Sequence, residues 1–173
     1  MRTNNEIEDD SIIIDNDKVY DDYAHITRFY FTARHINAPK LPKGLDPEEK
    51  WKDDETVGRV CLYAYDNEPD VFYLSSLWVK ESERNKGLGY ELLNIATDYA
   101  IGYHAKFVWL KVLTDSWVHD WFKKFSFKDM SVKDEYTWMK AGIKALTKGV
   151  CDAYPSDDGA FVQTLNKLNA IEH

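Results

Sequence analysis

Hydrophobic and polar residues alternate in several short stretches in the middle of the chain, a pattern typical of β-strands. Residues 56–65 (TVGRVCLYAY) and 71–79 (VFYLSSLWV) predict two strands, and the polar residues 66–70 predict a hairpin-type turn between them. The second stretch is almost continuously apolar, which indicates burial on both faces of a sheet. Residues 106–112 (KFVWLKV) and 136–140 (YTWMK) predict two further strands.

Two other stretches have the spacing of an amphipathic helix. The first predicts a helix from about residue 88 to 103, whose apolar face is Leu88, Leu92, Ala96, Tyr99, Ala100 and Tyr103. Residues 116–125 predict a shorter helix with Ser116 as its N-cap. Helical spacing returns near the C-terminus and predicts a packed helix there, with Phe161, Leu165, Leu168 and Ile171 on one face.

The N-terminal third is less regular. We expect residues 1–11 to be frayed or disordered, and residues 18–36 fit both a helix and a strand, so we expect a helix-like start followed by a strand from about His25. Prolines and a glycine between residues 39 and 47 predict a long connection. It ends in PEEKWKDDE, a polar stretch with room for one helical turn.

Composition narrows the class of protein. At 173 residues, with 44% hydrophobic and 14% aromatic residues, the chain is expected to form one globular domain. The formal charge is -8, and residues 1–22 hold eight acidic side chains against two basic ones. Nucleic acid is therefore not expected as a partner, because no broad basic face is visible. An acidic rim would suit a cationic substrate, and solubility explains it equally well.

The number of cysteines and the length of the apolar runs argue against disulfide-rich, metal-binding and membrane proteins. Cys61 and Cys151 are too few for a disulfide framework and lack the spacing of a metal site, so we expect ordinary buried or half-buried thiols and no metal. No signal segment opens the chain, and no apolar run approaches the ~20 residues of a membrane span. We expect a cytoplasmic protein with no membrane partner.

A flexible, positively charged turn precedes the long helix, in the stretch ERNKGLG (residues 83–89). A helix start exposes unpaired N–H groups that carry about half a positive charge, and glycines allow a phosphate to approach them. Arg84 and Lys86 add countercharge, so the turn predicts a pyrophosphate site. It is neither a Walker loop nor a dinucleotide fingerprint, because the Ser/Thr of the first and the third glycine of the second are missing.

The order of strand, Arg-x-x-Gly-x-Gly turn, long helix, strand, short aromatic helix and strand resembles the GNAT superfamily of acyl-CoA-dependent N-acetyltransferases. The matching stretches are LSSLWVKESERNKGLGYELL (74–93), SWVHDWFKKFSF (116–127) and YTWMK (136–140). The resemblance implies an α/β (α+β) fold with a mixed, mostly antiparallel central sheet that is splayed in the middle, flanked by helices and followed by a C-terminal helical appendage. We expect an acidic segment at 1–17, one GNAT-like domain at 18–141 and a helical extension at 142–173.

The same resemblance implies a site for acetyl-CoA, the co-substrate. The strand before the turn would carry a bulge and bind the pantetheine arm through its main chain, and the strand of residues 106–112 would splay from it. The cofactor-binding set would be Leu77, Val79, Arg84, Asn85, Lys86, Gly87, Leu88, Gly89, Asp115 and Phe122. Asp115 replaces a common Asn, and Phe122 replaces a Tyr that often protonates the leaving thiolate, so protonation of the thiolate would lack this donor.

The catalytic residues are not assigned by the sequence, and the weak candidates are Tyr73, Ser75, Ser76 and His119. Tyr73 lies near the position where some family members have a catalytic Glu, although packing within a strand explains it better. Ser75 and Ser76 could pass a proton through water or act only as spacers. His119 has a suitable pKa range but is expected at the surface.

Three functions remain open. The favoured one is transfer of an acetyl group from acetyl-CoA to a primary amine of a small molecule, a polyamine, or a protein lysine or N-terminus. The alternative is a catalytically degenerate GNAT-fold protein that serves as a CoA-binding, structural or interaction module, which Phe122 and the missing strand carboxylate favour. In a third, the extension from Gly142 docks on a partner or on a second copy, giving a homodimer or a larger assembly.

Overall fold

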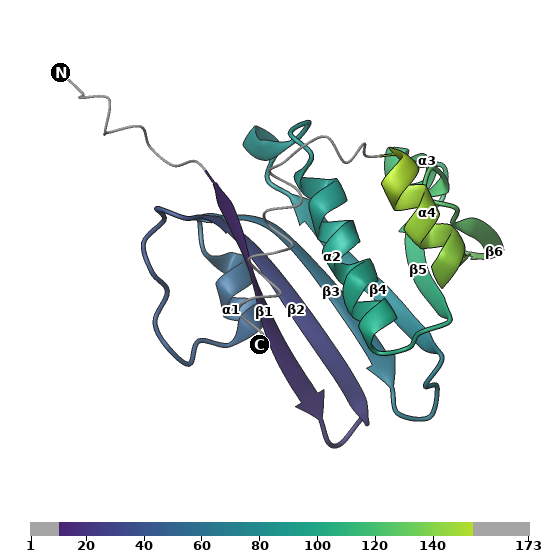
Figure 1. Cartoon of the computed structure of the whole chain (residues 1–173), viewed down its shortest axis with the longest axis horizontal. Helices are drawn as coiled ribbons and strands as arrows, with labels where there is room; N and C mark the ends of the chain where they lie inside the picture. Colours follow the sequence, from purple (N-terminus) through teal and green to yellow (C-terminus); the bar gives the residue numbers. More distant parts are fainter. Residues whose placement is uncertain (1–10, 154–173) are drawn as a thin grey trace.

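A single seven-stranded sheet organises the protein (Figure 1). The computed structural model describes residues 11–153. The strands lie in the order β1-β2-β3-β4-β5-β7-β6, and only β4 and β5 are parallel neighbours. Their bounds are Ile12–Asp21 (β1), Ile26–His35 (β2), Thr56–Tyr65 (β3), Val71–Val79 (β4), Phe107–Leu113 (β5), Lys128–Lys133 (β6) and Tyr136–Gly142 (β7). The expected mixed, mostly antiparallel α+β fold is confirmed.

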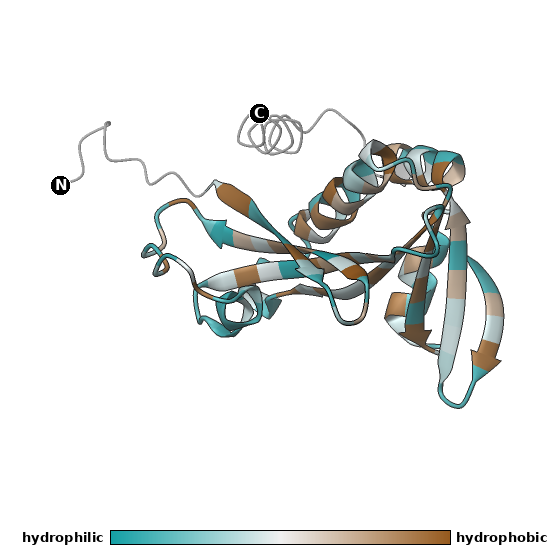
Figure 2. Ribbon diagram, turned by 90° about the horizontal axis from the view of Figure 1, so that it is seen from below, coloured by the Kyte–Doolittle hydropathy of each residue, from teal (hydrophilic) through white to brown (hydrophobic). Residues whose placement is uncertain are grey.

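Helices cover the two faces of the sheet unequally. They are α1 (Pro47–Lys52), the 3-10 turn η1 (Glu81–Glu83), α2 (Leu88–Gly102), α3 (Trp117–Lys123) and α4 (Ile143–Ala153). Figure 2 shows α2 and α4 above the sheet and the short α1 below it. The short α1 packs on β2 and β3, whereas α3 packs on β5 and α4 on β7.

The upper face and α2 form the core. Phe31 of β2 is fully buried, and its ring lies edge-on to that of Tyr99 of α2, with centroids 4.9 Å apart. Gly58 of β3 lies under the start of α2, where a Cβ would come 3.0 Å from Leu88 Cδ2 and from Leu92 Cδ1. The missing side chain therefore lets the N-terminus of α2 approach the sheet, and this sets the position of the turn that precedes it.

The sheet opens in its middle, between β4 and β5. Their pairing runs from Val71↔Phe107 to Leu74↔Leu110 and then stops, so the C-terminal parts of both strands have no partner across the gap. On its other side β4 is bulged, because Arg59 pairs with Trp78 while Cys61 pairs with Ser75. Within the bulge Ser76 adopts a left-handed φ of 61°. The expected splay and the expected bulge are both confirmed.

Two strands differ from the sequence-based expectation. A helix-like start at residue 18 is wrong, because β1 runs from Ile12 to Asp21 and pairs along its whole length with β2. Residues 12–17, which we had assigned to the acidic N-terminal segment, therefore belong to the sheet. β6 was not predicted, because all six residues of this edge strand are exposed and leave no buried alternation.

The C-terminal helix α4 is part of the fold. Leu146 and Val150 on this helix are buried in the main core. Gly149 lies where α4 meets the connection after α3, and a Cβ there would come 2.8 Å from the carbonyl carbon of Phe125. The helix expected at residues 161–171 and the disorder expected at residues 1–10 lie outside the described residues.

Candidate functional site

The turn between β4 and α2 presents main-chain N–H groups. Asn85 and Gly87 both have left-handed φ values, of 64° and 88°, and Gly87 is the N-cap of α2. The first helical hydrogen bond runs from the Glu91 amide to the Gly87 carbonyl, at 3.1 Å. Within residues 11–153 no acceptor faces the amides of Asn85, Lys86, Gly87, Leu88 and Gly89.

Charged side chains surround these amides. The exposed Arg84 side chain folds back, and its Nε donates to the Val79 carbonyl at 2.9 Å. Lys86 Nζ lies 3.4 Å from one carboxylate oxygen of Glu83, and His35 Nε2 lies 3.0 Å from the other. Burial alone would raise the pKa of Glu83, but the hydrogen bond and charge of His35, together with Lys86, outweigh it and lower the pKa. A bound anion would therefore compete with Glu83 for Lys86.

Helix α3 lies against this turn. A Cβ on Gly89 would come 3.6 Å from the Trp121 ring, and Trp121 packs edge-on against Tyr90 of α2, with centroids 5.5 Å apart. Phe122, the next residue, is only 3% exposed and packs against Phe127, with ring centroids 5.5 Å apart. Phe122 is therefore a core side chain with no proton to donate.

His119 of α3 is a buried structural residue, so its expected place at the surface is wrong. Its Nδ1 accepts the N–H of Asp115 at 3.1 Å, which places the ring proton on Nε2, 2.7 Å from Asp129 Oδ1. The expected cap is confirmed, because Ser116 Oγ accepts the His119 N–H at 3.2 Å. Because α3 starts at this cap, the side chain of His119 faces the interior. Its hydrogen bond to Asp129 connects α3 to β6.

Tyr73 of β4 is held by its neighbours. Its ring stacks on that of Tyr63, with centroids 5.1 Å apart, and its hydroxyl donates to both carboxylate oxygens of Glu68, at 3.2 and 3.3 Å. Burial, followed by the hydrogen bond to Glu68, raises the pKa of Tyr73 to about 12. The hydroxyl is thus committed to the β3–β4 turn, at the opposite end of β4 from the bulge.

Ser75 and Ser76 line a cavity of about 270 Å³ on the lower face of the sheet, between β2, β3, β4 and α1. Its other lining residues are Ile26, Arg28, Tyr30, Glu48, Trp51, Cys61, Tyr63 and Tyr65. Cys61 forms its floor and is hydrogen-bonded to Ser75, and burial raises the pKa of this thiol to about 11. The bulge of β4 therefore opens onto an aromatic cavity with one cation and one carboxylate.

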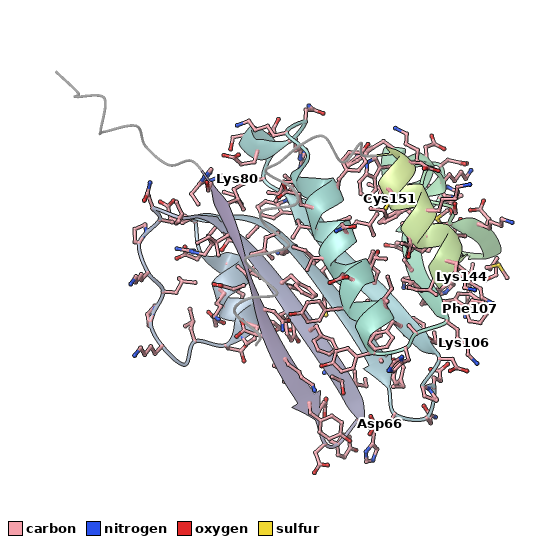
Figure 3. All side chains as sticks on the ribbon, in the orientation of Figure 1. Asp66, Lys80, Lys106, Phe107, Lys144 and Cys151 are labelled. Carbon is pink, nitrogen blue, oxygen red and sulfur yellow. The ribbon has the colours of Figure 1, made fainter. Side chains whose placement is uncertain are left out.

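A second cavity, of about 520 Å³, lies over β4, β5 and β7 on the same face. Tyr73, Trp109 and Trp138 form its walls. Phe107, at the start of β5 (Figure 3), lies under the Lys140 ammonium, whose Nζ is 3.9 Å from the ring centroid. This cavity already holds a cation of its own and does not include the serines of the bulge.

The sequence model of the acetyltransferase (GNAT) family matches residues 14–127, more than half of the chain. The protein belongs to the GNAT acetyltransferase family. A comparison with the curated proteins gave no match.

Solved structures of GNAT proteins share the fold at low sequence identity. A GNAT-family protein from Desulfovibrio desulfuricans has a TM-score of 0.52 at 11% identity, covering 67% of this chain and 69% of that chain. FdhC, a nucleotide-linked sugar GNAT, has a TM-score of 0.54 at 14% identity, covering 73% and 63%. An acetyltransferase from Staphylococcus aureus Mu50 has a TM-score of 0.50 at 14% identity, covering 67% and 68%.

Sequence reasoning missed the two charged groups of this GNAT protein's first cavity, Arg28 and Glu48. Arg28 lies in a stretch whose sequence fits both a helix and a strand, and Glu48 lies in the expected connection. The weak signal was the PEEKWK stretch, where Asp46 caps α1 by accepting the Glu48 N–H at 2.9 Å. No spacing in the sequence relates α1 to β4, so only the fold brings these residues together.

Residues 11–153 contain no group of three or more His, Cys, Asp or Glu side chains that could hold a metal ion. Over the same range, no helix has the length and apolar character to span a membrane. The cytoplasmic location and the homodimer stay predictions.

Proposed function

We propose that the protein transfers an acetyl group from acetyl-CoA to a primary amine. One observation carries the proposal: β4 loses its partner β5 after Leu74 and then leads, through η1, into the turn whose amides at residues 85–89 meet no acceptor among the described residues. The end of β4 thus offers main chain without a strand partner on its β5 side for an extended arm, and the turn offers N–H groups for a diphosphate. These two features match the two halves of coenzyme A.

Each residue of this strand end has a physical role in the proposal. The main chain of Leu77 and Val79 borders the open side of β4 and would bind the pantetheine amides, and the turn amides with Arg84 and Lys86 would hold the diphosphate. Acetyl-CoA, when bound, supplies the acetyl group as an activated thioester. An N–H of β4 between Leu77 and Val79 would stabilise negative charge on the carbonyl oxygen as an amine attacks.

A CoA-binding protein without transfer is the second candidate. Phe122 supports it, because this core side chain cannot protonate a thiolate. Transfer remains the favoured function, since a thiol with a pKa of about 8.5 is a fair leaving group and water can protonate it. The two functions differ in one measurable step, loss of the thioester in the presence of an amine.

The diphosphate site is tested by changing Lys86. Coenzyme A and pantetheine, which lacks the diphosphate, are titrated into the protein by calorimetry. We expect Lys86→Glu to weaken coenzyme A binding at least about tenfold, because it places a negative charge beside the diphosphate, and to leave pantetheine binding unchanged. Lys144→Glu, a charge reversal at an exposed position of α4 (Figure 3), is the control.

Equal affinity of Lys86→Glu and the unchanged protein for coenzyme A would show that the turn does not hold the diphosphate. Thioester loss is then measured with a panel of amines. Binding of acetyl-CoA with no thioester loss for any amine would favour the second candidate over transfer.

A further inference from the structure

Two opposite charges, Arg28 and Glu48, line the cavity at the β4 bulge, and neither has a close ionic partner among the described residues. Arg28 of β2 makes one long contact, from Nη1 to Asp21 Oδ2 at 3.5 Å, and no other described residue accepts from its guanidinium. Glu48 of α1 is exposed at the rim of the cavity, receives no hydrogen bond to its carboxylate from the described residues and forms no ion pair with them. The two side chains line one cavity without pairing with each other.

Both charges influence the pKa of Cys61, which forms the floor of this cavity. Burial is the main reason that the pKa of Cys61 is raised, the positive charge of Arg28 opposes this rise, and the negative charge of Glu48 adds to it. The two groups therefore lie within electrostatic range of the same point. Between them, the cavity offers one site for an anionic group and one for a cationic group.

Aromatic rings give the cavity a fixed shape. Trp51 of α1 lies edge-on to Tyr30, with centroids 5.2 Å apart, and its indole N–H donates to Thr32 Oγ1 at 3.1 Å. Tyr63 lies edge-on to Tyr65, with centroids 6.0 Å apart. A volume of about 270 Å³ holds a small molecule with an apolar side chain and is too small for a folded segment.

We propose that this cavity is the acceptor site and that the acceptor is a compact zwitterion, a free α-amino acid, whose carboxylate binds Arg28 and whose ammonium binds Glu48. The proposal rests on the acetyl transfer proposed above, because Ser75 and Ser76 place the cavity at the bulge where the thioester would lie. A diamine would bring a second positive charge towards Arg28. A lysine side chain or an N-terminus within a polypeptide lacks the adjacent carboxylate.

The test measures binding directly. L-Phenylalanine and L-leucine are compared with their carboxamides, which keep the amine and the side chain but lose the negative charge. Binding is followed by calorimetry and by tryptophan fluorescence, since Trp51 lines the cavity. We expect each acid to bind at least about tenfold more tightly than its amide, a difference that corresponds to roughly 1.4 kcal/mol.

Matched variants assign each charge. Arg28→Met is expected to remove the preference for the acid, and Arg28→Lys to restore part of it. Glu48→Gln is expected to weaken acid and amide alike by about fivefold or more, because both carry the ammonium. Glu49→Gln is its control, since Glu49 lies next to Glu48 and is likewise exposed, but it is paired with Lys52 at 3.2 Å and does not line the cavity. Asp21→Asn, which frees Arg28, should leave acid binding unchanged or tighter.

The outcomes separate this proposal from the acetyl transfer. Carboxamides that bind as tightly as acids, or an Arg28→Met variant that keeps the preference, would overturn the zwitterion site. Acetylation of amines without a carboxylate, with no turnover of any amino acid, would also overturn the zwitterion site. That result would still support acetyl transfer. Selective amino-acid binding by a protein that binds no coenzyme A would support the site and overturn its role in transfer.

Discussion

The two cysteines lie in opposite environments. Cys61 is 4% exposed on the floor of the first cavity, and burial raises its pKa to about 11, whereas Cys151 is exposed on α4 (Figure 3). The expectation of a buried or half-buried thiol therefore holds for Cys61 and is wrong for Cys151. Cys151 lies in the last turn of α4, which ends at Ala153. The sequence of this short helix did not show which of its sides packs on the core.

This difference predicts selective alkylation. The thiolate is the reactive form, so a pKa raised to about 11 leaves on the order of one Cys61 thiol in a thousand ionised at pH 8. Iodoacetamide should modify one thiol per native chain at pH 8, and the second only after unfolding, as measured by intact-protein mass spectrometry. Cys151→Ser should abolish the fast modification, and rapid labelling of this variant in the native state would contradict the raised pKa.

His119 illustrates a residue whose chemical type suggests catalysis while its surroundings indicate structure. We expect His119→Ala to destabilise the fold by about 2–3 kcal/mol, because two hydrogen bonds are lost and a cavity is left in α3. Urea unfolding measures this change. Asp129→Asn, which retains an acceptor oxygen for Nε2, should lose less.

Coenzyme A affinity provides the second readout for His119→Ala. It should stay within about twofold of the unchanged protein, because the hydrogen bonds of His119 run to Asp115, Ser116 and Asp129 and not to the turn at residues 84–89. Normal stability combined with a large loss of affinity would assign His119 to the site.

At the scale of elements, hydrophobic pattern located those with one buried face. β3, β4, β5, β7 and α2 each place alternate or helically spaced apolar residues in the core, which made them visible in the sequence. β1 was obscured, since Val19 and Tyr23 happen to match a helical spacing, and β6 has no buried residue to signal it. An element with few buried side chains has no regular pattern of apolar residues by which the sequence could reveal it.

The contact of α4 with the segment after α3 depends on one missing side chain. Gly149→Ala would bring its Cβ within 2.9 Å of three backbone atoms of Phe125, which cannot rotate away. We expect a loss of about 1–3 kcal/mol in the free energy of unfolding, since α4 must shift outward. The loss is measured by urea or thermal denaturation.

Gly102 supplies the control for this helix substitution. It lies at the end of α2, and a Cβ there would meet no atom within 4 Å. Gly102→Ala should therefore be neutral or slightly stabilising. Equal effects of the two substitutions would show that helix propensity, and not the contact with Phe125, sets the change.

At the scale of the whole molecule, the sequence predicted one side of the candidate site better than the other. The turn at residues 84–89 is contiguous, so its glycines and cations were visible together. The first cavity is assembled from β2, β3, β4 and α1, whose residues are separated by up to about fifty positions along the chain. That Arg28 and Glu48 line the same cavity can be predicted only from the order of the strands, and no local pattern in the sequence encodes that order.

The open sheet makes a last prediction about the whole molecule. In the free protein, β4 beyond Leu74 has no strand partner on its β5 side, and the amides of residues 85–89 meet no acceptor among the described residues, so the N–H groups on this open side should exchange hydrogen rapidly. Saturating coenzyme A should slow exchange at residues 77–79 and 85–89, as measured by mass spectrometry of peptides. The fully paired hairpin of β1 and β2 provides an internal control and should change little. Uniform slowing over the whole chain would indicate global stabilisation by mass action, and unchanged exchange at residues 85–89 would place the diphosphate elsewhere.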